Sequence, residues 1–412
     1  MSKGIRLDQF KEPAFSADIL KLKAQNLYVN ATFNKENKFD FKFLFSENQE
    51  VKKLDLIANK SIKNSDFPVV NFFAPQNYFV KGQKYLISDE GKATSFIVLE
   101  SEEYKRKEEN QDYFKELKDL DFERLIVEEK TKEQLINLAY QSSIIDETDG
   151  KYLFEKLQLI KNNEVCNVYI DAIDDQPYTS SKECILLHFQ KAVDFVAVVI
   201  KNTFNINLDL IFYNVEDYNR EKKLPKKLDN LSIIGLKCNY PARSKVDKKF
   251  NYDLSIGVQA MLHLARVLID NNYKQTTTFL TVAGDDVVKP RNVEVPIGMS
   301  VKEIMENFNL KKEPKRIVMG QILTGISISE DETPINVTTR SILIFQNYVV
   351  LNQMECIGCA RCSQVCPQNL LPSYRYKFKE TGNLTFEEFS SNSKCIKCYC
   401  CSYICPSNIN LV

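Results

Sequence analysis

Glycine is scarce in this sequence, with 12 glycines in a chain of 412 residues. That is well under the usual share of about 7%. Nucleotide and flavin sites use glycine where the backbone must come close to a phosphate group. The composition therefore leaves little material for such a site.

Net charge and long apolar runs are absent as well. The 55 basic and 55 acidic residues give a formal charge of zero, which excludes the basic footprint of a nucleic-acid-binding protein. A membrane-spanning helix needs roughly 18 to 20 apolar residues, and the best stretch, AVDFVAVVI at residues 192–200, is half as long. The start, MSKGIRLDQFKEPAF, lacks the apolar segment of a signal peptide. These absences predict a protein that is soluble or peripheral to a membrane, with no transmembrane span.

Cysteine, in contrast, is abundant and ordered. CIGCARCSQVCPQN begins at Cys356 and CIKCYCCSYICPSN at Cys395, and both follow C-x2-C-x2-C-x3-C-P. Bacterial ferredoxins hold [4Fe-4S] clusters with this spacing, and the last cysteine of each run ligates the other cluster in two-cluster ferredoxins. The predicted ligands are therefore Cys356, Cys359, Cys362 and Cys405 for one cluster, and Cys395, Cys398, Cys401 and Cys366 for the other.

Zinc is the alternative occupant of these cysteines. Two zinc ribbons could be built from the C-x2-C pairs. Zinc gives no reason, however, for the third x2 step or for the repeated C-x3-C-P. A metal-ligand pattern also indicates a reducing compartment and not a disulfide framework. Cys400 is a ninth cysteine of this region and has no place in the assignment.

Hydrophobic patterns divide the rest of the chain. Short β-rich runs are typical of a small β unit, and dense mixed charge is typical of a solvated helical connector. Alternating strands and helices predict a largely parallel sheet covered by helices. The predicted order is an N-terminal region without assigned structure (1–64), a β unit (65–105), a charged helical connector (106–134), an α/β domain (135–272), an α+β module (275–332) and the cluster domain (345–412).

Two further segments carry a resemblance to a known family. TVAGDDVVKPRNVEVPIGMSVKEIMENF at residues 281–308 is similar to a soluble-ligand-binding β-grasp (SLBB) domain, and VKGQKYLIS at 80–88 resembles a turn of a barrel-sandwich domain. Together with the doubled cysteine runs, this order of parts resembles the RnfC family, the C subunit of the Rnf electron-transport complex. The resemblance implies a multidomain α/β and α+β fold: a β barrel-sandwich unit, a Rossmann-like NADH/flavin domain, a β-grasp module and a ferredoxin-type domain with two clusters.

The α/β domain departs from that family at three motifs. The family's glycine-rich loop corresponds to LAYQSSIIDETDGKYLFEKL, which keeps only Gly150, and its E-C-E-P-Y element corresponds to DDQPY at residues 174–178. Its Y-P-x-G-G-E element corresponds to YPARSKVD at 240–247. Side chains in place of these glycines would fill the space of a flavin ring or a phosphate. The candidate remnants of a nucleotide site are Gly150, Asp174, Asp175 and Tyr178.

Three functions are compatible with these observations. The favoured hypothesis is an iron-sulfur electron-transfer subunit, peripheral on the cytoplasmic face of an Rnf-like membrane complex, that relays single electrons through two [4Fe-4S] clusters to other subunits. The second is an NADH-oxidising, FMN-containing subunit that feeds those clusters, which the resemblance supports and the lost glycines oppose. The third is a soluble ferredoxin-like adaptor of another oxidoreductase.

Overall fold

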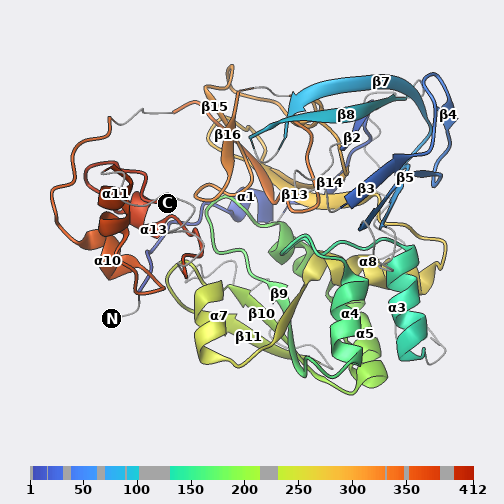
Figure 1. The fold of residues 1–412 in the computed structure, drawn as a ribbon, viewed down its shortest axis with the longest axis horizontal. Helices are drawn as coiled ribbons and strands as arrows, with labels where there is room; N and C mark the ends of the chain where they lie inside the picture. The colour runs from blue at the N-terminus through green and yellow to red at the C-terminus, as the bar shows by residue number, and fades with distance from the viewer. Residues whose placement is uncertain are drawn as a thin grey trace.

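The computed structural model describes residues 3–15, 17–30, 39–62, 70–88, 91–101, 130–213, 231–329, 332–347, 352–380 and 394–412. The strands in these residues form one six-stranded, two four-stranded and one three-stranded sheet. Figure 1 shows three parts: a helix-covered sheet, a group of β sheets stacked on it, and a small helical C-terminal part at one side. The chain is thus a mixed α/β protein with several sheets. Among the described residues, no helix combines the length and hydropathy needed to cross a bilayer.

The helix-covered sheet is parallel throughout, as the alternation of strands and helices predicts. Its strand order is β11-β10-β9-β12, with every neighbouring pair parallel. Strands buried on both faces read as apolar runs, and β9, NVYIDA, is buried along nearly its whole length. The elements of this part are α3 (Lys132–Gln141), α4 (Leu153–Lys161), β9 (Asn167–Ala172), α5 (Ser181–Phe204), β10 (Asn207–Tyr213), β11 (Ser232–Leu236), α7 (Arg243–Lys249), β12 (Leu254–Gly257) and α8 (Val258–Ile269).

The six-stranded sheet has the order β1-β14-β13-β17-β15-β16. Its central strand β13 is buried at every residue, which places this sheet in the core between the other parts. The helix that follows β14 begins where expected, because Ser300 Oγ accepts the backbone N–H of Glu303 at 3.2 Å. The elements are α1 (Glu12–Phe15), β1 (Leu20–Lys21), β13 (Thr277–Ala283), β14 (Arg291–Pro296), α9 (Val301–Met305), β15 (Arg316–Met319), β16 (Ile326–Ile328) and β17 (Ser341–Phe345).

The N-terminal region, which shows no clear pattern in the sequence, supplies strands to three sheets. β1 joins the six-stranded sheet beside β14, and β2 pairs with β8. The partners lie far along the chain, so no local turn signal announces them. The two remaining sheets have the orders β2-β8-β7-β4 and β3-β5-β6. Their strands are β2 (Asn26–Asn30), β3 (Phe39–Phe43), β4 (Glu50–Val51), β5 (Leu56–Ile62), β6 (Val70–Phe73), β7 (Tyr78–Ile87) and β8 (Ala93–Glu100).

The C-terminal part consists of the cysteine loops and short helices α10 (Arg361–Val365), α11 (Pro372–Glu380) and α13 (Cys400–Tyr403). It lies beside the N-terminus of the chain (Figure 1). Gly4 donates its backbone N–H to Val365 O at 2.9 Å, which ties the two together. The predicted connector at 106–134 falls mostly outside the described residues, and the predicted domain boundaries stay predictions.

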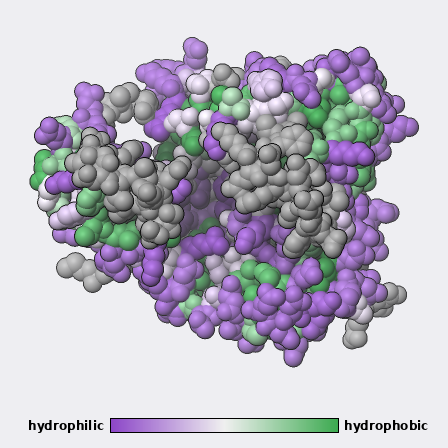
Figure 2. All heavy atoms as spheres, in the orientation of Figure 1, coloured by the Kyte–Doolittle hydropathy of each residue, from purple (hydrophilic) through white to green (hydrophobic). Residues whose placement is uncertain are grey.

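The surface of the C-terminal part is more apolar than its surroundings. Figure 2 shows a largely hydrophilic face, on which hydrophobic residues gather over the C-terminal part at the left and over the small β sheets at the upper right. Large apolar side chains that are exposed in the C-terminal part include Met354, Ile357, Leu371, Tyr374, Ile396 and Tyr403. A small part that carries two cysteine loops has few residues left to build a core of its own.

Candidate functional site

The two cysteine loops have the same backbone course. At three equivalent positions each loop has a residue with a φ of 52° to 72°, in the left-handed region: Gly358 and Lys397, Ala360 and Tyr399, Asn369 and Asn408. Left-handed residues within a turn direct successive backbone N–H groups to one side, and such concavities hold iron-sulfur clusters in many proteins. The two cysteine loops therefore repeat the same arrangement of backbone N–H donors as well as the same cysteine spacing.

Four of the predicted ligands line one cavity. Cys356, Cys359 and Cys362 from the first loop face it together with Cys405 from the second. Ile409 and Leu411, both buried, form part of its wall. Three thiols from one loop and one from the other are the donor set of a two-cluster ferredoxin. These residues fit a [4Fe-4S] cluster in the chemistry of their donors.

The second predicted set is buried to a similar degree: Cys366 and Cys401 are buried, and Cys395 and Cys398 are half-buried. Burial, followed by the proximity of Cys398, raises the pKa of Cys401 to about 11, and Cys395 adds to the same shift. Cys366 Sγ accepts the backbone N–H of Leu370 at 3.4 Å. Within the described residues, no group of three or more His, Cys, Asp or Glu side chains is arranged to hold a single metal ion. What indicates clusters is therefore the cysteine spacing together with the lining of the first cavity, and the assignment of all eight ligands stays a prediction.

Cys400 belongs to a different environment. Its side chain is fully buried and packs against Ile5, Leu7 and Tyr240, while its thiol donates to Tyr240 O at 3.7 Å. It faces the contact between the cluster domain and the rest of the protein. This position fits its lack of a role in the cysteine spacing.

Tyr240 joins the second cysteine loop to the α/β domain. Its hydroxyl donates to Cys398 O at 3.0 Å and accepts a hydrogen bond from Gln176 Nε2 at 3.2 Å. Its backbone pairs with Ile5 in both directions, at 2.9 and 3.0 Å. Gln176 and Tyr240 lie in the DDQPY and YPARSKVD motifs, so the structure brings together two of the three motifs singled out in the sequence. Gln176 and Tyr240 thus hold the cluster domain against the α/β domain.

The crevice where a Rossmann-like domain would bind a nucleotide lies between β9 and β12. The chain leaves β9 toward β10 on one side, whereas β12 lies on the other, which makes this the switch point of the sheet. Helices α5 and α8 follow these two strands and begin at the same edge. Helix N-termini at such an edge are ready anion sites.

Carboxylates of the chain itself occupy both helix N-termini. Asp174 Oδ2 accepts the backbone N–H groups of Lys182 and Glu183, at 2.9 and 3.0 Å, in the first turn of α5. The Glu147 carboxylate accepts those of Gln259 and Ala260, at 3.0 and 3.2 Å, in the first turn of α8. The donors that would bind a phosphate are therefore already paired.

Gly257, the residue before α8, is a glycine because the Glu147 carboxylate lies against its backbone. A Cβ atom at this position would collide with the Glu147 carboxylate. Asp146 Oδ2 accepts the Gly257 N–H at 2.8 Å. The missing side chain of Gly257 therefore makes room for the Glu147 carboxylate of the same chain. Burial and the neighbouring Asp146 raise the pKa of Glu147 to about 7.

Buried ion pairs also lie at this edge of the sheet. Burial costs a charged group its hydration, so such charges must be paired with good geometry. Lys182 pairs with Asp171 at 3.1 Å and Lys156 with Asp146 at 2.8 Å, and in each pair both side chains are at most 4% exposed. Arg340, the residue before β17, forms an ion pair with Asp174. The buried charged side chains at this edge are thus paired with other groups of the same chain.

The other candidate remnants are also engaged in the fold. Asp175 Oδ2 accepts the Ala242 N–H at 2.7 Å, and burial raises the pKa of Asp175. Tyr178 has a φ of 66° and stacks on Phe10 with ring centroids 5.3 Å apart. Gly150 has a φ of 74° and lies at the exposed surface beside Thr338. The structure thus places Asp174 at the crevice and gives Asp175 and Tyr178 internal partners.

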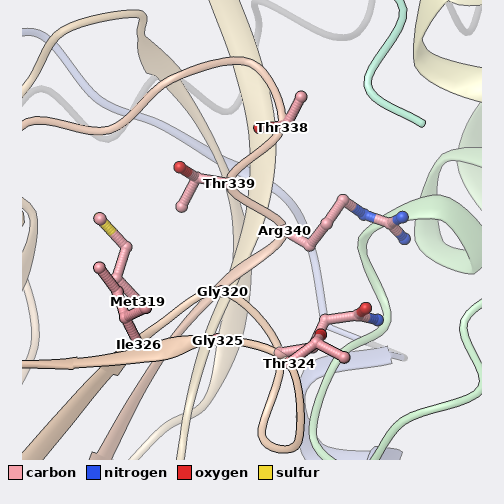
Figure 3. Close-up of a pocket in the computed structure, with 9 residues that line it drawn as sticks. Met319, Gly320, Thr324, Gly325, Ile326, Thr338, Thr339 and Arg340 are labelled. Atoms are coloured by element: carbon pink, nitrogen blue, oxygen red, sulfur yellow. The ribbon is translucent and has the colours of Figure 1, made fainter. Parts of the chain in front are cut away.

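A small polar cavity adjoins the crevice on the side of the six-stranded sheet. Figure 3 shows its lining, with Arg340 extending away from Met319 and Ile326. Its volume is about 200 Å³, below the range of roughly 300 to 1,000 Å³ typical of small-molecule sites. Gln321 and Thr324 in its wall accept hydrogen bonds from Gln176 Nε2 at 3.0 and 3.1 Å. FMN and NADH therefore do not fit the described residues of this region.

The sequence pattern did not single out Glu147 or Arg340. Glu147 lies within the segment that corresponds to the family's glycine-rich loop, in IIDETDG, where three carboxylates replace small residues. That local excess of acidic residues was the available signal. The sequence around Arg340 gave no signal of its role, because its partner Asp174 lies in another part of the chain, beside another sheet.

The fold and the cysteine loops define a mixed α/β protein with a C-terminal part of the two-cluster ferredoxin kind. The family of 4Fe-4S dicluster domains matches residues 355–409, which include all the predicted ligands. The chain is similar to the C subunit of ion-translocating oxidoreductase complexes. It is 26% identical over 274 residues to that subunit of Buchnera aphidicola subsp. Baizongia pistaciae, covering 61% of this chain and 54% of the relative.

Other relatives with the same description match shorter stretches. The protein of Vibrio cholerae is 31% identical over 160 residues, which are 37% of this chain and 19% of the relative. That of Methanosarcina acetivorans is 35% identical over 96 residues, which are 23% and 21%. The chain thus spans about half the length of the first relative, and less of the others. The resemblance to the RnfC family that the sequence suggests is confirmed.

Among solved structures, the chain is similar to a NAD+-reducing [NiFe]-hydrogenase in the H2-reduced state. The TM-score is 0.41 at 11% identity, over 54% of this chain and 48% of that one. A likeness of this size carries no functional argument.

Proposed function

We propose that this protein is an iron-sulfur electron-transfer subunit of an Rnf-type complex, relaying single electrons through two [4Fe-4S] clusters. Its relatives are described as subunits of ion-translocating oxidoreductase complexes. By this proposal the protein is peripheral on the cytoplasmic face of the membrane and hands electrons to or from other subunits. The clusters supply the redox chemistry. The chain supplies thiolates, backbone N–H donors and burial, which set the cluster potentials.

One observation favours this relay over oxidation of NADH by the same chain. Glu147 and Asp174 occupy the helix N-termini at the switch point, where a nucleotide phosphate would bind. Displacing Asp174 would also leave the largely buried Arg340 without its ion-pair partner. In the proposed protein the α/β domain is a scaffold, and Gln176 and Tyr240 attach the cluster domain to it.

A reductive titration tests the proposal. Full-length protein, loaded with iron and sulfide under anaerobic conditions, is titrated with NADH and then with dithionite while the visible absorbance of the clusters is followed. We expect dithionite alone to bleach the absorbance. Bleaching by NADH would show a working nicotinamide site and replace the relay with the dehydrogenase alternative. Bleaching by neither reagent would overturn the proposal of redox-active clusters.

A further inference from the structure

A third cavity lies between the small β sheets and the end of α8, apart from the crevice and the cysteine loops. Its volume is about 420 Å³, within the range of small-molecule sites. Segments far apart in the sequence line it: β1 and the residues after it, the turn at Lys53, the segment between β6 and β7, and the segment between α8 and β13. A cavity of this size at the junction of several elements is a common location for a ligand.

The charge of this cavity is one-sided. The described residues that line it include Lys21, Lys23, Lys53 and Lys274, and Asp270 is the one carboxylate of that described set. Within this described lining, four positive charges and one negative charge leave an excess of three, in a chain whose net charge is zero. Such a concentration of one sign attracts counter-charged ligands and raises their local concentration.

Strand pairing fixes the position of Lys21 in the wall of the cavity. β1 pairs in parallel with β14, which places Lys21 opposite Glu294. The Glu294 carboxylate is also engaged by Arg266 in a bidentate pair, at 2.6 and 3.1 Å, and by Thr277 Oγ1 at 2.5 Å. Burial in the first place, and then nearby Arg266, Lys53 and Lys23, lower the pKa of Lys21 to about 8, although Glu294 acts in the opposite sense. A bound anion would offset this crowding of positive charge.

Two other lysines are positioned by contacts of their own. The Lys274 ammonium lies 5.5 Å from the centre of the Phe73 ring, a cation–π contact. The Lys53 backbone N–H donates to Asn77 Oδ1 at 2.9 Å, which fixes the turn that carries it. Contacts within the fold therefore hold the turn that carries Lys53 and the ammonium group of Lys274.

We propose that this cavity binds a phosphate-bearing organic anion. Lysine ammonium groups are common phosphate ligands, and three or four of them match a group with two or more negative charges. Apolar parts of the wall, from Leu22, Pro75 and Pro296, suit an organic portion. A free metabolite and a lipid headgroup can both carry such a phosphate.

Calorimetric titration of the full-length, cluster-loaded protein with inorganic pyrophosphate tests the site. We expect binding to the wild type and about tenfold weaker binding to Lys53→Gln and to Lys274→Gln, since each removes one charge contact. Lys52→Gln is the matched control: it removes an exposed lysine next to Lys53 that does not line the cavity, and its affinity should stay within about twofold. Equal loss in Lys52→Gln and Lys53→Gln would mean diffuse electrostatics and would overturn the proposal.

Vesicle flotation separates the two sources of phosphate. Vesicles of phosphatidylcholine with phosphatidylglycerol are compared with phosphatidylcholine alone. Binding to the anionic vesicles that Lys53→Gln and Lys274→Gln weaken and Lys52→Gln does not, without binding of pyrophosphate, would assign the site to a lipid headgroup. Binding of pyrophosphate with that pattern assigns it to a free phosphate compound. Absence of both, in protein with intact cluster absorbance, would refute the site.

Discussion

The Tyr240 hydroxyl donates a hydrogen bond to the backbone carbonyl of Cys398, at 3.0 Å, across the boundary between the α/β domain and the cluster domain. Gln176 donates to the same hydroxyl from the DDQPY motif. A residue of the YPARSKVD motif thus contacts the backbone of a predicted cluster ligand. Polar groups that lie near a cluster tune its potential, so this contact couples the scaffold to the redox centre.

Tyr240→Phe removes that donor and keeps the ring. We expect the midpoint potential of one cluster to become more negative, because an O–H donor near the ligand stabilises the more negative reduced cluster. The other cluster should be unchanged, and the stability loss should be about 1 kcal/mol. A redox titration followed by electron paramagnetic resonance measures both midpoints. Tyr252→Phe, which removes a hydroxyl bonded to Asp209 in the same domain, is the control, and equal shifts in both variants would contradict the proposed coupling.

Cys362→Ser removes a predicted ligand of the first cluster. We expect the protein to lose roughly half of its iron while the second cluster remains at least partly assembled, since three ligands of each cluster come from separate loops. Iron and sulfide analysis with visible absorbance provides the measurement. Cys400→Ser is the matched variant in the neighbouring loop and should retain both clusters. Full iron content in Cys362→Ser, or loss of a cluster in Cys400→Ser, would show that the ligand assignment is wrong.

Glu147 makes stability depend on pH. Its folded pKa is about 7 and its ordinary value is 4.5, so between these values the folded protein holds a proton that the unfolded chain has released. This favours the folded state at low pH, and the advantage is lost as the pH rises through 7.

The comparison of wild type with Glu147→Gln isolates that effect. From about pH 5 to about pH 8, the unfolding free energy of the wild type should fall relative to the variant, by on the order of 1 kcal/mol per unit of pKa shift. Denaturant melts at several pH values measure the difference. A flat difference for Glu147→Gln would exclude its titration near neutrality.

Arg340→Met leaves the buried Asp174 carboxylate without its cationic partner. We expect a loss of about 3 to 5 kcal/mol in unfolding free energy, as for other broken buried pairs. Adding Asp174→Asn should recover part of that loss, since the uncompensated charge is then gone. Denaturant unfolding followed by tyrosine fluorescence is suitable. Lys315→Met, at an exposed position beside the same sheet, should stay within about 0.5 kcal/mol; an equal effect in both variants would mean that the buried pair contributes nothing specific.

Much of the architecture could be predicted because it follows from local patterns. The buried run of β9 and the long amphipathic α5 predict a parallel sheet covered by helices, and Ser300 indicates the start of α9. The strands of residues 1–64 could not be predicted in the same way. β1 is two residues long, and its partner β14 comes from a distant part of the chain. A two-residue strand that pairs with a distant segment is too short to show the alternating hydrophobic pattern by which strands are recognised in a sequence.

The kind of redox group follows from the cysteine spacing alone. Three ligands of each predicted cluster lie within seven residues of one loop. The spacing of cysteines along a short segment therefore specifies the redox group that they can hold. The fate of the nucleotide crevice, in contrast, depends on tertiary structure. Glu147 reaches the start of α8, more than a hundred residues later, only because of which strands become neighbours. That choice is made by packing of the whole core, since the pairing of buried charges is a property of three-dimensional proximity and not of spacing along the chain.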